Sequence, residues 1–332
     1  MPSGAEAPRS WRVHRLGPPA EALVLEPRPA RDPGPGEVRV QVAAVGLNHP
    51  DLLLCAGRYQ ERPALPFSPG YEAAGTVVAA GPGSSYRAGQ RVIVVPELPE
   101  GALQESLTVP DQQVYPVPDE VPTTAAAVLH IAYSTAYVAL HHRAGLRPGE
   151  TVLVTGGAGG VGSAAAQLAR AAGARVIATA TGPDRAAACR GFGAEEVLDP
   201  ADEGLVERVR GLTGGRGVDV VVDVVGGELF ARLRRCVAFE GRLVTVGFTG
   251  GSIPAAPVNH VLLRNYAVVG LHLALYRRRD PDLLRRVHEE LVRLHRAGVV
   301  APRVTELPFE QAPEGLGMLA RRDVVGRVVL RC

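Results

Sequence analysis

Lysine is absent from the 332-residue sequence, so all 36 basic side chains are arginines. This absence excludes chemistry that needs a lysine amine, such as a Schiff base, and the phosphate-binding lysine of a P-loop. The arginines are spread along the chain against 34 acidic residues, and the formal charge is only +2. We therefore do not expect a protein that binds nucleic acid.

Cysteine is scarce, with four residues and no C-x-x-C pair, which argues against a disulfide framework and a structural zinc site. No window reaches the roughly 18 uninterrupted apolar residues that span a bilayer. The N-terminus, with Pro2, Glu6 and Pro8, lacks the basic start and apolar segment of a secretory signal. We expect a cytoplasmic protein that is not attached to a membrane.

Short runs of β-forming residues, each bounded by Gly or Pro, fill the first 120 or so positions. Val38, Val40 and Val42 alternate with polar residues, which is typical of a strand with one buried face. Hydrophobic residues make up 46% of the sequence, enough for sizeable cores in two domains. The first half therefore reads as a small β-barrel or sandwich.

The pattern changes after Pro122, where Thr123 and Thr124 precede an Ala-rich stretch, 125–140, that we predict as one helix with these threonines as N-cap candidates. From Thr151 onward, β-branched runs alternate with helical segments, and the runs 218–225 and 242–246 are nearly continuous Val and Leu. Such runs predict parallel strands that are buried on both faces. The fold class is therefore α/β, with a doubly wound parallel sheet.

The strongest single motif is TVLVTGGAGGVG, residues 151–162, in which a strand runs into G-x-G-x-x-G and then a helix. Gly157 permits the tight turn, Gly159 lets the backbone approach a pyrophosphate, and Gly162 lets the helix pack closely on the strand. The helix N-terminus then offers amides and the positive end of its dipole to the phosphates. This context favours a dinucleotide-binding site over a loop that merely turns.

The end of the second strand indicates which dinucleotide is bound. An acidic residue there would bind the ribose 2′-hydroxyl of NAD and repel a 2′-phosphate. The segment instead contains Thr179, Thr181 and, in the next turn, Arg185. Hydroxyls and a guanidinium suit a phosphate, so we predict NADPH rather than NADH.

With that motif in place, the sequence resembles the zinc-independent quinone oxidoreductases of the medium-chain dehydrogenase/reductase superfamily over nearly its whole length. The resemblance rests on the glycine motif with its flanks and on VGLNHPDLLLCAGRY (45–59), LPFSPGYEAAGTVVAAGPG (65–83) and DVVGRVVL (323–330). It implies a GroES-like β-barrel domain formed by both chain ends, 1–124 and 272–332. It also implies an inserted Rossmann domain, 125–271, that binds NADPH.

The resemblance implies that no metal is bound. Zinc-dependent relatives use a Cys and the His of a Gly-His-Glu motif among their ligands, whereas the matching positions here are Asn48 and Tyr71. At most one ligand of the usual set remains, and a catalytic zinc needs three protein ligands.

The resemblance also implies the site residues. Tyr59 is predicted to position and polarise the substrate carbonyl, with Asn48 as a second hydrogen-bond donor, although a tyrosine that merely fills the barrel is an equal alternative. His49 and His130 replace apolar or small residues of the family, and are either satisfied imidazoles or residues that tune substrate choice or donate a proton. We interpret Asp51 and Glu72 first as structural residues. The expected cofactor-binding residues are Asn48, Thr135, Gly157, Gly159, Gly160, Val161, Gly162, Thr179, Thr181, Arg185, Gly247, Phe248 and Arg327.

The expected reaction is a metal-free hydride transfer from NADPH to a small-molecule substrate, either a quinone or an α,β-unsaturated carbonyl. Two alternatives stay open: an enoyl-thioester reductase for polyketide-like or fatty acyl substrates, and an NADPH-binding protein with a structural or sensing role and little turnover. The apolar run 266–271 predicts the edge strand of the Rossmann sheet, and a bare apolar edge favours a homodimer.

Overall fold

The computed structural model describes residues 7–29 and 31–332 and divides the chain into two compact units. The first unit combines both chain ends, 1–131 and 302–332, and the second is the segment Ala132–Ala301. Pro2 and Glu6, which bear on the prediction of no secretory signal, lie outside the described residues. No single described helix is long and apolar enough to cross a membrane, and only the bent pair Thr123–Leu129 and Ile131–Arg143 passes by length and composition.

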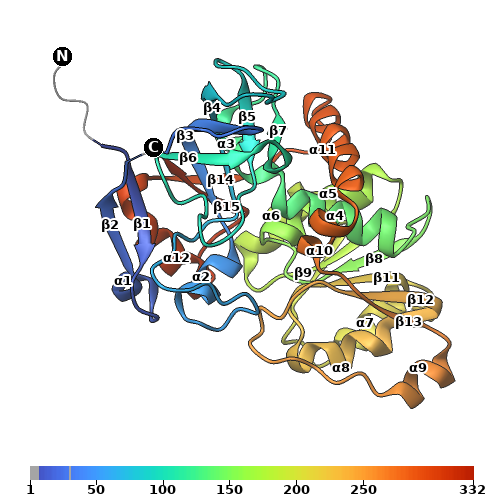
Figure 1. Ribbon diagram of the computed structural model, residues 1–332. Helices are drawn as coiled ribbons and strands as arrows, with labels where there is room; N and C mark the ends of the chain where they lie inside the picture. The colour runs from blue at the N-terminus through green and yellow to red at the C-terminus, as the bar shows by residue number, and fades with distance from the viewer. Residues whose placement is uncertain (1–6, 30) are drawn as a thin grey trace, which may run out of the picture. The chain divides into compact units, whose positions relative to one another are not determined.

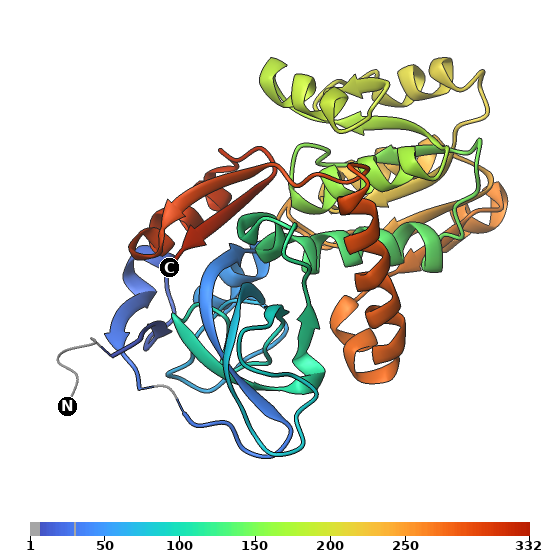
Figure 2. The same ribbon diagram turned by 90° about the horizontal axis from the view of Figure 1, so that it is seen from above.

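The first unit is built around a seven-stranded sheet in which β6 pairs with β3 and the other strands follow the order β14-β15-β3-β4-β5-β7. Figure 2 shows the red pair β14 and β15 beside the blue N-terminal strands, and β15 pairs antiparallel with β3. The elements are β1 (Arg9–Val13), α1 (Pro19–Ala22), β2 (Leu23–Pro27), β3 (Glu37–Leu47), α2 (His49–Cys55), β4 (Glu72–Ala80), β5 (Arg91–Val94), β6 (Ser106–Pro110), η1 (Asp111–Gln113), β7 (Val114–Pro116), α3 (Thr123–Leu129), β14 (Val304–Pro308), η3 (Phe309–Gln311), α12 (Ala312–Arg321) and β15 (Arg327–Arg331).

The predicted alternation in β3 is confirmed, because Val38, Val40 and Val42 are all buried. Their side chains join Trp11 and Phe67 in the core of the unit. β3 thus contributes one buried face to the core of this unit, as its alternating pattern predicts.

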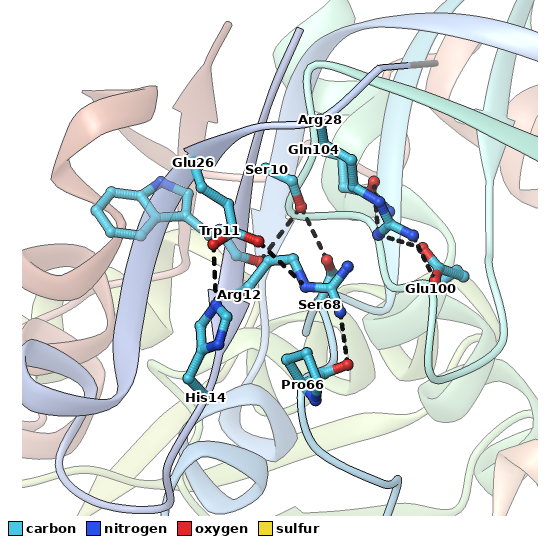
Figure 3. A network of polar contacts seen from close by, with 10 residues as sticks. All are labelled: Ser10, Trp11, Arg12, His14, Glu26, Arg28, Pro66, Ser68, Glu100 and Gln104. Carbon is cyan, nitrogen blue, oxygen red and sulfur yellow. Dashed lines mark hydrogen bonds and ion pairs between the residues drawn. The ribbon is translucent and has the colours of Figure 1, made fainter. Parts of the chain in front are cut away.

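Hydrogen bonds join side chains of β1 to the loop that precedes β4 (Figure 3). The buried hydroxyls of Ser10 and Ser68 lie 2.8 Å apart, and Arg12 donates to the carbonyl of Pro66 at 2.6 Å. Because Ser68 stands two residues before Gly70, these contacts fix the start of the segment Gly70-Tyr71-Glu72.

The second unit contains a six-stranded parallel sheet in the order β10-β9-β8-β11-β12-β13 (Figure 1). This order, with the chain crossing back after β10, is that of a doubly wound nucleotide-binding sheet. The elements are α4 (Ile131–Tyr137), the π-helix η2 (Val138–Arg143), β8 (Thr151–Val154), α5 (Gly160–Ala171), β9 (Arg175–Thr179), α6 (Pro183–Gly191), β10 (Glu196–Leu198), α7 (Leu205–Leu212), β11 (Val218–Asp223), α8 (Gly227–Cys236), β12 (Val237–Thr245), α9 (Val258–Arg264), β13 (Ala267–Gly270), α10 (Leu273–Arg279) and α11 (Pro281–Arg296).

The unit boundaries differ from the predicted ones at 125 and 271. The segment 272–301, which the resemblance assigns to the GroES-like domain, belongs to the unit that carries the parallel sheet. At the end of that segment the backbone N–H of Ala301 donates to the side chain of Gln167 on α5 at 2.6 Å. On α11, Leu284, Val287 and Leu291 are buried, so this helix contributes an apolar face to the core.

The Ala-rich stretch is not one helix. Pro122, rather than either threonine, is the N-cap of α3, and the helix ends before His130. There the Glu72 carboxylate accepts a hydrogen bond from the backbone N–H of Ile131 at 2.8 Å, and it also bonds the backbone of His130. The Glu72 carboxylate on β4 thus accepts hydrogen bonds from backbone N–H groups that a continuous helix would pair with its own carbonyls.

Candidate functional site

The glycine turn joins β8 to α5, and packing requires two of its glycines. A Cβ added at Gly162 would lie 2.1 Å from the carbonyl oxygen of Gly156. One added at Gly157 would lie 2.8 Å from the Cβ of Ala178 and 3.0 Å from the Sγ of Cys189. No real side chain fits at such distances, so the turn forms only with glycine at these positions.

The same turn leaves room for an anion at the start of α5. A Cβ at Gly159 would meet a single neighbouring atom within 4 Å, the Gly156 oxygen at 3.3 Å. Gly159 is the N-cap of the twelve-residue helix α5, and its first turn contains no acidic residue. The first amides of the helix, those of Gly160 and Val161 among them, have no acceptor within the helix and lie at the positive end of its dipole. This geometry fits a pyrophosphate.

The predicted phosphate-binding residues at the end of β9 and after it differ from one another in burial. Thr179 is buried and supports the glycine turn with two hydrogen bonds. Its hydroxyl accepts from the backbone N–H of Gly156 at 3.3 Å. Its carbonyl accepts from the backbone N–H of Gly157 at 2.9 Å. Thr181 is exposed, and Arg185 is half-buried in the first turns of α6. Of the two hydroxyls predicted to meet a phosphate, only that of Thr181 lies at the surface.

The remaining predicted residues of this unit lie on two elements. Gly247 and Phe248 follow β12, and the Phe248 ring is so close to the backbone that a Cβ on Gly226 would lie 2.7 Å from its Cδ1. Phe248 is 40% exposed, so part of its ring is available to a ligand. Thr135 lies on α4 and is buried.

In the first unit, Asn48 and Arg327 meet in a buried polar network that also contains Glu72 and Asp51. The Arg327 guanidinium donates to Asn48 Oδ1 at 2.8 Å and to Glu72 Oε1 at 2.5 Å. Asn48 Nδ2 donates to the carbonyl of Gly46 at 3.1 Å and to Glu72 Oε1 at 3.2 Å. Both amide hydrogens of Asn48 are thus engaged, so the amide is placed to hold the network.

Asp51 completes this network from the first turn of α2. Its two oxygens accept from the backbone N–H groups of Asn48 at 2.8 Å and Gly70 at 2.9 Å. Burial raises the pKa of Asp51 to about 7 and nearby Glu72 acts in the same direction, whereas the two amides and Arg327 oppose the shift. Burial also raises the pKa of Glu72, against Arg327 and its other hydrogen bonds. One buried cation therefore faces two buried carboxyl groups.

Tyr59 lies in the loop after α2 and is half-buried. Its ring meets that of Tyr71 edge to face, with centroids 6.0 Å apart. Tyr71 is buried, and its hydroxyl donates to Glu61 at 3.4 Å. Tyr59 thus packs its ring against a buried aromatic side chain while part of the residue stays exposed.

Comparisons with known proteins cover both units. The family description "Alcohol dehydrogenase GroES-like domain" matches residues 34–119, and "Zinc-binding dehydrogenase" matches residues 160–289. The chain is 36% identical over 325 residues to the quinone oxidoreductase-like protein 2 of Bos taurus, covering 97% of this chain and 93% of that protein. The chain belongs to the quinone oxidoreductase family of medium-chain dehydrogenases/reductases.

Solved structures of this quinone oxidoreductase family have the same fold. A mycobacterial protein complexed with NADPH aligns with a TM-score of 0.91 at 31% identity, covering 98% of this chain and all of that one. The Escherichia coli quinone oxidoreductase complexed with NADPH aligns with a TM-score of 0.90 at 28% identity, with the same coverage. The predicted combination of a GroES-like domain and a Rossmann-type domain is therefore confirmed.

Although one matching description names zinc, the candidate ligand positions of this quinone oxidoreductase-like chain hold Asn48 and Tyr71, and both side chains take part in the contacts described above. Among residues 7–29 and 31–332, no three His, Cys, Asp or Glu side chains come together in a way that could hold a metal ion.

The two histidines that depart from the family pattern both belong to the first unit. His130 is fully buried, and its ring centroid lies 4.1 Å from that of Tyr115. His49 is the first residue of α2 and is half-buried, and burial together with Arg322 lowers its pKa. His130 is thus a packed core residue, and His49 is protonated less readily than an ordinary histidine.

Sequence reasoning gave no role to Asp223, the last residue of β11. Its carboxylate is buried, and it accepts hydrogen bonds from the loops at the ends of β8 and β11. The signal available was an acidic residue at the end of the apolar run VDVVVD, because ligands of open α/β sheets bind at the carboxyl ends of the strands.

Proposed function

We propose that this chain is an NADPH-dependent oxidoreductase that transfers a hydride, without a metal ion, to a quinone or an α,β-unsaturated carbonyl. The observation that carries the proposal is the glycine turn, in which Gly157 and Gly162 admit no side chain and Gly159 leaves room for a phosphate. The NADPH complexes of its structural relatives support the choice of cofactor.

The residues of the second unit fit the cofactor. The amides at the start of α5 would hold the pyrophosphate, and Thr181 with Arg185 would hold the 2′-phosphate. Gly247 and Phe248, at the carboxyl end of the sheet, would contact the nicotinamide half. When bound, NADPH supplies the hydride from its nicotinamide ring.

The acceptor oxygen gains negative charge as the hydride arrives, and a hydrogen-bond donor stabilises that charge. In our proposal Tyr59 is this donor, because a phenol donates without being deprotonated first. Asn48 and Arg327 act as positioning residues through the buried network, since both amide hydrogens of Asn48 are already engaged.

The experiment that tests the function is NADPH oxidation by the purified chain, in the presence of a metal chelator, with panels of quinones, enones and enoyl thioesters. We expect turnover with a quinone or an enone that the chelator leaves unchanged. Turnover with the thioesters alone would favour the acyl-tailoring alternative. NADPH binding without oxidation by any acceptor would favour a structural or sensing protein.

Replacing Arg185 tests the cofactor assignment. The change Arg185→Ala should weaken NADPH binding by about tenfold to a hundredfold, because a charge-assisted contact to a phosphate contributes about 1.5–3 kcal/mol. NADH binding should stay nearly unchanged. Titration calorimetry with both cofactors measures the difference, and Arg190→Ala, at an exposed position of the same helix, is the matched control. Equal losses for NADPH and NADH would contradict the assignment.

Replacing Tyr59 tests the donor. In Tyr59→Phe the hydride-transfer rate should fall, by less than the roughly 2.7–4 kcal/mol of an oxyanion-hole donor, because a quinone ring delocalises charge. NADPH affinity should stay within about twofold, or about 0.4 kcal/mol. Single-turnover kinetics measure the rate, with Tyr86→Phe as control, since the Tyr86 hydroxyl donates to the carbonyl of Val114. An unchanged hydride-transfer rate would show that Tyr59 only packs in the site and does not donate to the acceptor oxygen.

We also propose that the chain forms a homodimer through the β13 edge of its parallel sheet. β13 is the last strand of the sheet, and its Val268 is 38% exposed. The preceding helix α9 exposes the apolar side chains of Val258, Leu262 and Leu263. A second copy would cover this apolar surface and the open strand edge. Light scattering should give twice the 34.9 kDa mass of one chain, and a monomer would refute the proposal.

A further inference from the structure

Asp223 ends β11 with a buried carboxylate whose hydrogen bonds are unevenly shared between its two oxygens. Oδ1 accepts three, from the hydroxyl of Thr155 and from the backbone N–H groups of Val225 and Gly226, each at 3.0 Å. Oδ2 is buried and has no hydrogen-bond partner among the described residues. No arginine or histidine among residues 7–29 and 31–332 forms an ion pair with this carboxylate. Burial raises the pKa of Asp223, and the three donors oppose that shift.

The backbone of Asp223 also ties neighbouring loops together. Its carbonyl accepts from Val246 N–H at 2.8 Å and from Gly247 N–H at 3.4 Å, in the loop after β12. Thr155, bonded to the side chain, begins the loop after β8 that becomes the glycine turn. Asp223 thus stands where the carboxyl ends of three adjacent parallel strands meet.

The strand order assigns this place to one half of the cofactor. In the proposed function the glycine turn would hold the pyrophosphate, and the residues after β9 would lie near the adenosine ribose. β9 and β10 lie on one side of β8, and β11, β12 and β13 lie on the other. Because a doubly wound sheet binds one mononucleotide on each half, the nicotinamide would lie over the half that contains Asp223.

We propose that the buried carboxylate of Asp223, which three hydrogen-bond donors hold through Oδ1, favours the oxidised form of the cofactor, NADP⁺, over NADPH. This inference rests on the proposed function. Transfer of a hydride, a proton with two electrons, from NADPH to the quinone or enone reduces that acceptor and would leave the nicotinamide ring as a cation. A carboxylate without a protein counter-ion attracts that cation and has no such interaction with the neutral ring. Asp223 therefore assists hydride donation without touching the substrate.

The test compares the affinities of the two cofactor forms by titration calorimetry at pH 8, with no acceptor present. In Asp223→Asn, NADP⁺ binding should weaken about tenfold more than NADPH binding, a differential of about 1.4 kcal/mol. Equal weakening of both forms would overturn the proposal, because a purely structural role moves the two affinities together.

A matched control removes a hydrogen bond and keeps the charge. Thr155→Val deletes one donor to Oδ1 and the acceptor of the Val224 N–H, and it should affect NADP⁺ and NADPH alike because Asp223 itself is kept. If Asp223→Asn does not fold, Asp223→Ser replaces it, because a serine hydroxyl still accepts from backbone amides in such a turn. Failure of the wild-type chain to bind either form would refute the proposed function. Binding of both forms with an unchanged ratio in the variant would refute only the role of Asp223.

Discussion

Arg327→Met should lower the free energy of unfolding by about 3–5 kcal/mol at pH 8, because it leaves a buried carboxylate without its cation. Arg327 is 6% exposed, and Glu72, with which it forms the ion pair, is fully buried. Methionine fills much of the same space, so lost packing contributes little to the change. Urea unfolding monitored by circular dichroism measures the difference.

The matched control is Arg331→Met on the same strand. Arg331 is exposed and pairs with Glu306 at 3.4 Å, and a surface ion pair of this kind contributes at most about 1 kcal/mol. A loss in Arg327→Met no larger than in this control would show that the buried network does not stabilise the fold.

The loss in Arg327→Met should depend on pH in a definite direction. The pKa of Asp51 rises from 3.8 to about 7 in the folded chain, so between these values the folded state binds more protons than the unfolded state. Stability supplied by such a group falls as the pH rises through that range. Burial raises the pKa of Glu72 in the same direction, and without Arg327 that pKa should rise further, since no cation then opposes the burial. Cys55 on α2 also faces Asp51, but its pKa is raised to about 12 and it does not titrate here.

The deficit relative to the wild-type chain should therefore be smallest near pH 5 and largest near pH 8. Taking the difference between variant and wild type at each pH removes the contribution of surface carboxylates such as Glu37, whose pKa is about 2. A deficit that is the same at both pH values would contradict the proposed protonation.

The sequence predicts the parallel sheet because each of its signals lies within a short segment of the chain. The run Thr151–Val154 is buried throughout, and the glycines that follow it are required by contacts within the same turn and the next strand. The buried network gives no such signal, because its members are far apart in sequence: Asn48 and Glu72 are 24 residues apart, and Asn48 and Arg327 are 279 apart. Only the folded barrel brings them together.

The broken helix shows the same limit. The composition of 125–140 favours a continuous helix, and nothing within the stretch ends it at His130. The interruption is accompanied by a hydrogen bond from the backbone of Ile131 to Glu72, which is 59 residues earlier in the chain. The acidic residue Asp223 at the end of an apolar run is visible in the sequence, but a nearly continuous buried run does not tell which face its side chain occupies.

Gly162→Ala should be the most damaging change in the glycine turn. Its Cβ would lie 2.1 Å from the Gly156 carbonyl oxygen and 2.9 Å from the Cα of Gly157, and both are backbone atoms that move only if the turn moves. Overpacking of this kind costs about 1–3 kcal/mol of stability. Displacing the turn should also weaken NADPH binding by about a hundredfold or more, equivalent to about 2.7 kcal/mol. Thermal unfolding and titration calorimetry measure the two effects.

Two further alanine variants separate folding from binding. In Gly159→Ala the new Cβ meets only the Gly156 oxygen within 4 Å, at 3.3 Å, and the backbone is extended, so the fold should be nearly unchanged. NADPH binding should weaken, because the methyl group would occupy the place of the phosphate. In Gly211→Ala, on α7, the Cβ meets no atom within 4 Å, so stability should rise by up to about 1 kcal/mol and binding should not change. If Gly162→Ala binds NADPH as well as Gly211→Ala does, the turn tolerates displacement and the cofactor must be held elsewhere.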